Sequence, residues 1–411
     1  MLNNQGRPTQ PDHDAPTAPA PVKTFTGNRG LQSREPLIFE TGRHEVTGVD
    51  IDEPAAFTPR LGTLARKQAI DLPGLSEPEA MRHYVRLSQK NYAIDAGLYP
   101  LGSCTMKHNP RLNEKMARLP GLADIHPLQP QSTVTGAIAL IEDLARWLIT
   151  ITGMQAVAMS PKAGAHGEAC GMMAIKAAIE ARGEGDTRTV VLVPESAHGT
   201  NPATAALIGY SVRSIRADAT GTVRVADVKA ALGPDVAAIM LTNPNTCGLF
   251  ETDIVEVAEA VHDAGAYFYC DGANLNAIMG KVRPGDLGVD AMHINLHKTF
   301  STPHGGGGPG AGPVVLSQAL APFAPVPFVA KGELVEHTQG TRSFGRMTAF
   351  HGQMGMFVRA LTYMLSHGGD GLRQASEDAV LNANYIRACL KDIMSGPFAE
   401  KPCMHEALFD D

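Results

Sequence analysis

The sequence predicts an α/β protein in which helices cover both faces of a mostly parallel sheet. From about residue 133 to residue 345, short apolar runs alternate with stretches whose apolar residues recur at helical spacing. Several of the short runs end in Pro, Asn or Gly, which is typical of strands that stop at a turn. Strands that alternate with helices favour a parallel sheet flanked by helices.

Six segments are expected to be strands because they are short, apolar and bounded by turn residues. They are residues 156–159, 189–193, 236–241, 267–270, 293–296 and 314–316. Helices are expected at residues 77–90, 136–152, 167–182, 253–264 and 373–389. A last strand is expected to begin at Pro402.

Four regions follow one another along the 411 residues. Residues 1–30 hold prolines among small and polar residues without periodicity, which predicts a disordered tail or one that wraps a partner. Residues 31–132 are expected to form an extended and helical segment, and residues 133–345 the large α/β domain. Residues 346–411 are expected to form a helical linker and the start of a smaller C-terminal α/β domain.

Composition excludes several classes of protein. A net charge of -7 without a long basic run argues against nucleic acid as the main ligand. No stretch approaches the roughly 20 apolar residues of a membrane span, and no signal-peptide core follows the first residues, so a cytoplasmic protein without membrane contact is expected. The six cysteines form no CxxC pair, which predicts neither a disulfide framework nor a metal site.

Ligands of parallel α/β sheets bind at the carboxyl ends of the strands, and four such places hold reactive or polar residues. The turn at residues 160–168 contains two glycines and precedes a helix, so it suits a phosphate, although it could be only a turn. His198 could lie flat on an aromatic ligand or bond to backbone. Asp271 could hold a protonated ring nitrogen or cap its turn. Lys298 could be a desolvated amine that forms a Schiff base, or a surface lysine.

Together these four features are the parts that pyridoxal phosphate needs, and they occur on successive strand ends. Several motifs also resemble the glycine decarboxylase P-protein family, in particular its subunit 2 form. The motifs are Gly-Ser-Cys-Thr-Met-Lys (102–107), Gly-Ala-His-Gly-Glu (164–168), Ser-Ala-His-Gly-Thr-Asn-Pro (196–202), Asp-Gly-Ala-Asn (271–274) and Leu-His-Lys-Thr-Phe (296–300) with the glycine run 305–308.

The resemblance implies a fold type I pyridoxal-phosphate-dependent transferase, with the cofactor held on Lys298 as a Schiff base. The remaining site residues that it implies are His198 stacked on the ring, Asp271 at the ring nitrogen, Ala273 and His297 beside it, the amides of Ala165 and His166 at the phosphate, and Thr246 as a looser contact. No metal is implied. His166 stands where many relatives have Gln or Asn, and the family continues beyond Asp411 through a full small domain.

The resemblance also implies a reaction and partners. Glycine would lose carbon dioxide, and the aminomethyl group would pass to the oxidised lipoyl arm of H-protein in the glycine cleavage system. The expected assembly is an α2β2 heterotetramer with the homologous P-protein subunit 1, which lacks the Schiff-base lysine. Three alternatives stay open: transamination or another amino-acid decarboxylation with Arg342 and Arg346 on a second carboxylate, a non-catalytic scaffold, and a nucleotide-binding protein.

Overall fold

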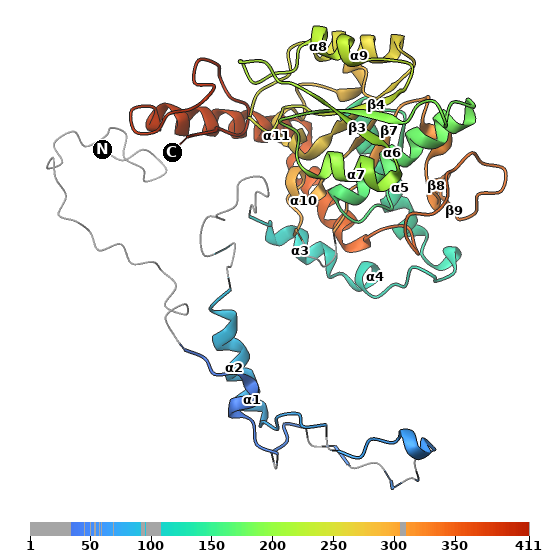
Figure 1. The fold of residues 1–411 in the computed structure, drawn as a ribbon. Helices are drawn as coiled ribbons and strands as arrows, with labels where there is room; N and C mark the ends of the chain where they lie inside the picture. The colour runs from blue at the N-terminus through green and yellow to red at the C-terminus, as the bar shows by residue number, and fades with distance from the viewer. Residues whose placement is uncertain are drawn as a thin grey trace, which may run out of the picture. The chain divides into compact units, whose positions relative to one another are not determined.

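The computed structural model describes residues 34–91 except 45, 50, 53, 54, 57, 59 and 69, together with residues 95, 108–304 and 310–410 (Figure 1). The chain divides into two compact units, Met1–Gly97 and Leu98–Asp411. The predictions for the tail 1–30, the motif 102–107 and the glycine run 305–308 lie outside the described residues.

The first unit holds short helical elements. They are α1 (Ile38–Thr41), η2 (Gly62–Leu64) and α2 (Glu77–Ser88). Helix α2 confirms the helix predicted at residues 77–90. Its start is fixed by a capping box, in which the Glu79 carboxylate accepts a hydrogen bond from the Ser76 N–H (2.9 Å), and Pro78 lies in its first turn.

The second unit is built on a seven-stranded sheet. Its strands are β1 (Ala156–Ala158), β2 (Val190–Pro194), β3 (Ser211–Ile215), β4 (Val236–Thr242), β5 (Tyr267–Asp271), β6 (Ala291–His293) and β7 (Val314–Leu316). Their order across the sheet is β1-β7-β6-β5-β4-β2-β3. Strand β7 runs antiparallel to the other six strands, which are parallel to one another, and this confirms the predicted mostly parallel sheet.

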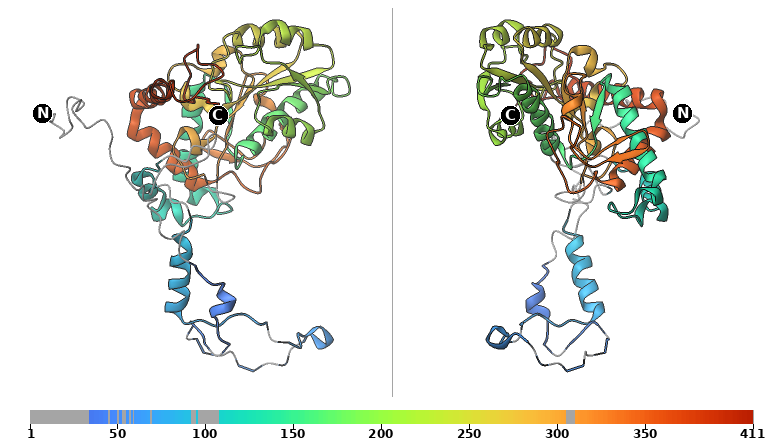
Figure 2. Two further views of the ribbon diagram at one scale, coloured as in Figure 1. Left: turned by 60° about the vertical axis from the view of Figure 1, so that its left-hand side comes forward. Right: turned by 90° about the vertical axis from the view of Figure 1, so that its right-hand side faces the viewer.

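Helices and smaller elements surround the sheet. They are α3 (Arg111–Ala117), α4 (Pro120–Ala123), η3 (Gln131–Thr133), α5 (Thr135–Thr152), α6 (Gly164–Ala181), α7 (Thr200–Ile208), α8 (Val225–Ala231), α9 (Ile254–Asp263), η4 (Gly272–Ala277), η5 (Pro284–Leu287), α10 (Leu296–Thr299), η6 (Ala321–Phe323), β8 (Phe328–Ala330), β9 (Glu333–Val335) and α11 (Met354–Leu390). Helices lie on both faces of the sheet (Figure 2).

Two apolar cores form because alternate residues of a strand point to opposite faces. Ile239 and Leu241 of β4 pack in one core with residues of α5, α9 and α11. Ala238 and Met240 of the same strand pack in the other core with residues of α6 and α7. All seven residues of β4 are buried, as expected for a central strand covered on both sides.

Two strand predictions are wrong. The run 293–296 is not a strand, because β6 ends at His293 and a helical turn begins at Leu296. The N–H groups of Lys298 and Thr299 donate hydrogen bonds to the Asn295 carbonyl (3.0 and 3.1 Å), which closes a helical turn. The apolar Leu296 is therefore a buried residue of a helical turn and not of a strand. The strand expected from Pro402 is also absent from the described residues, where Asp410 forms only an isolated bridge with Ser395.

Candidate active site

A cavity of about 320 Å³ opens at the carboxyl ends of β4, β5 and β6. Sequence-predicted site residues that line it are Ala165, His198, Thr246, Asp271, Ala273, His297 and Lys298. The remaining one, His166, lies beside the cavity in the first turn of α6, where its ring accepts a hydrogen bond from the Lys162 N–H (3.1 Å). The chain therefore brings together residues from separate strand ends at one place.

One wall of the cavity is the N-terminus of α6. The helical hydrogen bonds begin with Gly167 N–H to Ala163 O (2.8 Å), so the N–H groups of Gly164, Ala165 and His166 precede the ladder. A Cβ atom at Gly164 would lie 2.5 Å from Asn295 Oδ1, so any larger residue here would displace the buried Asn295 side chain. Free N–H groups at the positive end of an 18-residue helix form a suitable cradle for a phosphate.

The floor of the cavity is Asp271, the last residue of β5. Its Oδ1 accepts a hydrogen bond from the Ala273 N–H (2.9 Å), and its Oδ2 accepts one from Asn201 Nδ2 (3.1 Å). His293 Nε2 lies 3.4 Å from Oδ1. Burial acts to raise the pKa of Asp271, but the His293 ring and the two donors outweigh it and hold that pKa below its ordinary value. The side chain is therefore a carboxylate at neutral pH.

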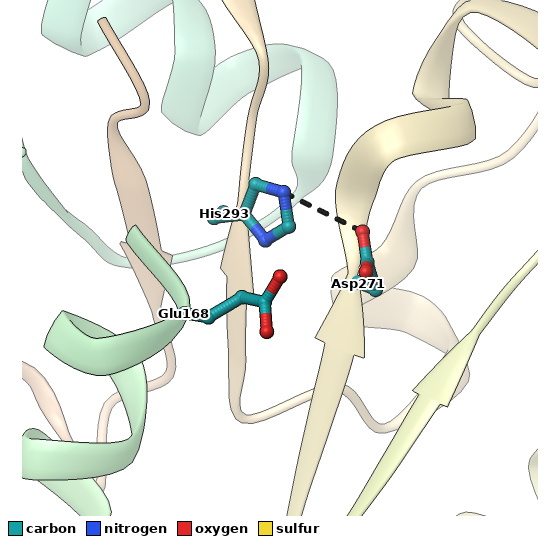
Figure 3. A group of neighbouring side chains, drawn as sticks. All are labelled: Glu168, Asp271 and His293. Atoms are coloured by element: carbon teal, nitrogen blue, oxygen red, sulfur yellow. Dashed lines mark ion pairs between the residues drawn. The ribbon is translucent and has the colours of Figure 1, made fainter. Parts of the chain in front are cut away.

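A second buried acid, Glu168 of α6, lies next to Asp271. Its Oε2 accepts hydrogen bonds from Asn201 Nδ2 (3.0 Å) and Thr204 Oγ1 (3.2 Å). Burial, together with the nearby Asp271 carboxylate, raises the pKa of Glu168 from 4.5 to about 8. Figure 3 shows its carboxyl group turned toward His293 and Asp271.

The opposite side of the cavity is formed by two loops. His198, in the loop before α7, is exposed at the cavity, and its Nδ1 accepts a hydrogen bond from the Thr200 N–H (3.2 Å). The ring proton therefore lies on Nε2. Thr246, in the loop after β4, donates its hydroxyl proton to the Ser196 carbonyl and so ties the two loops together.

Lys298 is half-buried in the short helix α10 and lines the cavity together with Asp271. The neighbouring His297 ring packs edge-on against the His304 ring, with 4.7 Å between the ring centroids. The positive charge of Lys298 acts to lower the pKa of both Glu168 and Asp271. Its effect is smaller than those of burial, of the neighbouring charges and of the hydrogen bonds.

The site fits pyridoxal phosphate by the chemistry of its groups. It offers free amides for a phosphate, a carboxylate for a protonated ring nitrogen and an amine for an aldehyde. Two further polar atoms, Thr242 Oγ1 and Asn295 Oδ1, are buried and have no hydrogen-bond partner within the described part of the chain. Both residues line the cavity, as expected where a polar ligand supplies the missing partner.

Comparison with known proteins gives the family. Residues 166–339 match the model of the class-V aminotransferase family. A relative from Caulobacter vibrioides, named probable glycine dehydrogenase (decarboxylating) subunit 2, is 67% identical over 418 residues, which cover 100% of this chain and 79% of the relative. The chain belongs to the glycine dehydrogenase (decarboxylating) subunit 2 family. A relative of the same name from Exiguobacterium sibiricum is 51% identical, over 91% of this chain and 77% of its own length.

Solved structures agree on the fold. The crystal structure of a glycine decarboxylase (P-protein) of the glycine cleavage system matches with a TM-score of 0.69 and 22% identity, over 84% of this chain and 79% of that chain. Sphingosine-1-phosphate lyase of Burkholderia pseudomallei matches with a TM-score of 0.62 and 15% identity, over 87% and 79%. The family and the fold type predicted from the sequence are thereby confirmed.

Several residues of the site were not predicted from the sequence. They are Glu168, Asn201, Thr242, His293 and Asn295. Glu168 and Asn201 belong to motifs that indicated the family, but the sequence analysis assigned neither of them a role, although the glycine spacing around Glu168 was a usable signal. His293 was predicted only as the first residue of the strand at residues 293–296, and it was given no role in the site.

The two arginines considered for a second substrate carboxylate are engaged elsewhere. Arg346 Nη2 donates to the Glu336 carbonyl (2.6 Å), and the Arg342 guanidinium lies over the Phe323 ring at 4.6 Å from its centroid. Neither arginine lines the cavity. The transaminase alternative therefore loses the observation on which it depended.

Proposed function

We propose that this chain is the cofactor-bearing subunit of a pyridoxal-phosphate-dependent glycine decarboxylase. Its relatives are named for glycine dehydrogenation with decarboxylation. The observation that carries the proposal for the site is that Lys298, Asp271 and the start of α6 line one cavity. The predicted enzyme class and cofactor agree with the family and the fold.

The proposed contacts are supported by the residues that line the cavity. The amides of Ala165 and His166 would hold the phosphate, and the Asp271 carboxylate would face the ring nitrogen. His198 would stack on the ring with Ala273 nearby, and Lys298 Nζ would hold the cofactor covalently. Thr246 and His297 lie at the edge of the site.

The reaction uses these groups in a defined way. Pyridoxal phosphate, when bound, supplies an electron sink for the pair left by the departing carbon dioxide. Asp271 keeps a proton on the ring nitrogen, because a buried carboxylate stabilises the cation opposite it. Lys298 Nζ would hold the cofactor, and as an amine that lines the cavity it could also accept or return a proton there. His198 Nε2–H remains available as a donor toward the cavity.

The proposed partners follow from the family. Relatives named subunit 2 imply a subunit 1, and we propose that the two homologous subunits form an α2β2 heterotetramer that passes the aminomethyl group to lipoylated H-protein. In the part of the chain that the structure describes, no helix is both long and apolar enough to cross a membrane. We propose a cytoplasmic enzyme, and the domain boundaries at residues 132 and 345 stay predictions.

The proposal is tested by absorption spectroscopy, borohydride reduction and peptide mapping of the purified chain supplied with pyridoxal phosphate. A reduced adduct on Lys298 is expected, and it should disappear in Lys298→Ala. Lys281→Ala is the control, because Lys281 is half-exposed and pairs with Glu377 (2.7 Å) rather than lining the cavity. An adduct that persists in Lys298→Ala would overturn the assignment of the lysine. Carbon dioxide release from glycine, with subunit 1 and lipoylated carrier added, then tests the reaction.

A further inference from the structure

Three buried side chains meet beneath the cavity, each from a different element. Glu168 comes from α6, Asp271 from β5 and His293 from β6 (Figure 3). Their exposed fractions are 3%, 3% and 1%, and one ligand atom of each lies within 4.8 Å of the others. Two acids and one imidazole therefore share a space with little access to water.

The two acids share one donor group. Asn201 Nδ2 donates to Glu168 Oε2 (3.0 Å) and to Asp271 Oδ2 (3.1 Å). Among the described residues, no arginine or lysine lies within ion-pair distance of either acid, and His293 is the one basic group that does. A divalent cation in this cluster would have to compete with amide hydrogens already directed at those oxygens.

The His293 imidazole is neutral, and its ring proton points toward Asp271. The Tyr269 hydroxyl lies 2.6 Å from His293 Nδ1 and has no other hydrogen-bond partner in the described part of the chain, so its proton is directed at Nδ1. Burial raises the pKa of Tyr269 well above its ordinary value and lowers that of His293, which keeps the hydroxyl protonated and the ring neutral. The ring proton then lies on Nε2, which faces Asp271 Oδ1 at 3.4 Å.

Two ionised carboxylates without a buried cation between them would repel strongly in this environment, so one of them retains a proton. Each acid accepts two hydrogen bonds, Asp271 from the Ala273 N–H and the Asn201 amide, and Glu168 from the Asn201 amide and the Thr204 hydroxyl. Asp271 also has His293 Nε2 at 3.4 Å from its Oδ1, and Glu168 has no basic group at such a distance among the described residues. The negative charge is therefore better stabilised on Asp271 than on Glu168. The retained proton therefore belongs on Glu168.

We propose that Glu168 is a positioning residue that carries a proton at neutral pH, so that Asp271 is the single negative charge beneath the ring nitrogen of the cofactor. The inference rests on the proposed function in taking Asp271 as the partner of that nitrogen. Other titratable groups near Glu168 are Tyr269 of β5 and Lys298 of α10, and His198 of the loop before α7 lies near His293. Ionisation of Glu168 at alkaline pH adds a second charge beside Asp271 and makes the two acids compete for Asn201.

The first test is infrared difference spectroscopy of the full chain without added cofactor. The carbonyl band of a protonated buried carboxyl is expected at pH 7, and it should fade as the pH rises past about 8. Glu168→Gln should remove the band. Glu251→Gln is the matched control, because Glu251 is equally buried, burial also raises its pKa and it also accepts from an asparagine amide (2.8 Å), but it does not line the cavity. It should leave the Glu168 band in place.

The second test is nitrogen NMR of bound, ¹⁵N-labelled pyridoxal phosphate. Glu168→Gln replaces one neutral group by another, so the ring nitrogen should stay protonated and the affinity for the cofactor should change by less than about threefold. Loss of ring-nitrogen protonation in this variant, or the absence of a Glu168 band at pH 7, would overturn the inference. If Glu168→Gln does not fold, the inference is tested by the Glu168 band in Glu251→Gln alone. That band should be present at pH 7 and fade as the pH rises past about 8. A missing Lys298 adduct would instead count against the proposed function, because the infrared band needs no cofactor.

Discussion

Replacement of Glu168 by glutamine should change how the stability of the protein depends on pH. The pKa of Glu168 is raised to about 8 in the native state from an ordinary value of 4.5. Between these values the native chain holds a proton that the unfolded chain has released. Its contribution to stability is therefore fully present below pH 4.5 and is lost as the pH rises through about 8.

The size of this loss follows from the shift. At about 1.4 kcal/mol per pKa unit, Glu168 alone removes roughly 4 kcal/mol of stability between pH 5 and pH 8. For a unit of roughly 300 residues the unfolding entropy is about 0.6 kcal/mol per kelvin, so the loss corresponds to a fall of about 6 °C in the unfolding midpoint. Glutamine cannot ionise, and its variant lacks this part of the pH dependence.

The assay compares the unfolding midpoints of the wild-type chain and Glu168→Gln at pH 5, 6, 7 and 8. The midpoint of the variant minus that of the wild type should grow by about 6 °C from pH 5 to pH 8. Other titrating groups are common to both proteins and cancel in the difference. Glu180→Gln, at an exposed position of α6, is the control and should give a constant difference. A constant difference for Glu168→Gln as well would refute the reasoning.

Three further substitutions test the site. Asp271→Asn should lower kcat for carbon dioxide release by about 100-fold, measured with the reconstituted system, because a neutral amide does not hold the proton on the ring nitrogen. Gly164→Ala should weaken cofactor binding about tenfold in a fluorescence titration, because its Cβ would lie 2.5 Å from Asn295 Oδ1, whereas Gly136→Ala meets no atom within 4 Å and should not. Asn201→Ala should lower the free energy of unfolding by about 1–3 kcal/mol in urea at pH 7, because both acids lose a donor. Unchanged values in any of the three would contradict the role given to that residue.

The sequence predicted the strand ends well because polar residues there interrupt apolar runs. Asp271 directly follows such a run, and the structure has it as the last residue of β5. The same rule misassigned residues 293–296, because an apolar run of this length does not distinguish a buried strand from a buried helical turn. The error left Lys298 near its predicted position but on a helix, α10.

The edge strand β3 was missed for a different reason. Ser211–Ile215 holds only two apolar residues, and most of its side chains are exposed, so its pattern resembles that of a loop. Its pairing with β2 is set by tertiary contact rather than by local preference. Contacts of this kind are not visible in a single sequence.

The buried partners of Asp271 were missed although a signal was present. Gly164, Gly167, Glu168 and Gly171 recur at intervals of three and four residues, so they share one face of α6. Three glycines on one face indicate a helix that approaches the sheet closely, and a glutamate on that face must then be buried. The observed contact agrees, because a Cβ atom on Gly171 would lie 2.6 Å from the Tyr269 ring.

The close approach of α6 and the charge state of the site are therefore one feature of the chain. The glycine face lets α6 lie against β5 and β6, and this contact takes Glu168 out of water. Burial beside Asp271 then makes a second charge costly, so the proton stays on Glu168 and the charge on Asp271. The same approach brings the N-terminal amides of α6 to the cavity, where they can bind a phosphate. Glycines that look like simple spacers in the motif thus determine both the proposed phosphate cradle and which of the two acids carries the charge.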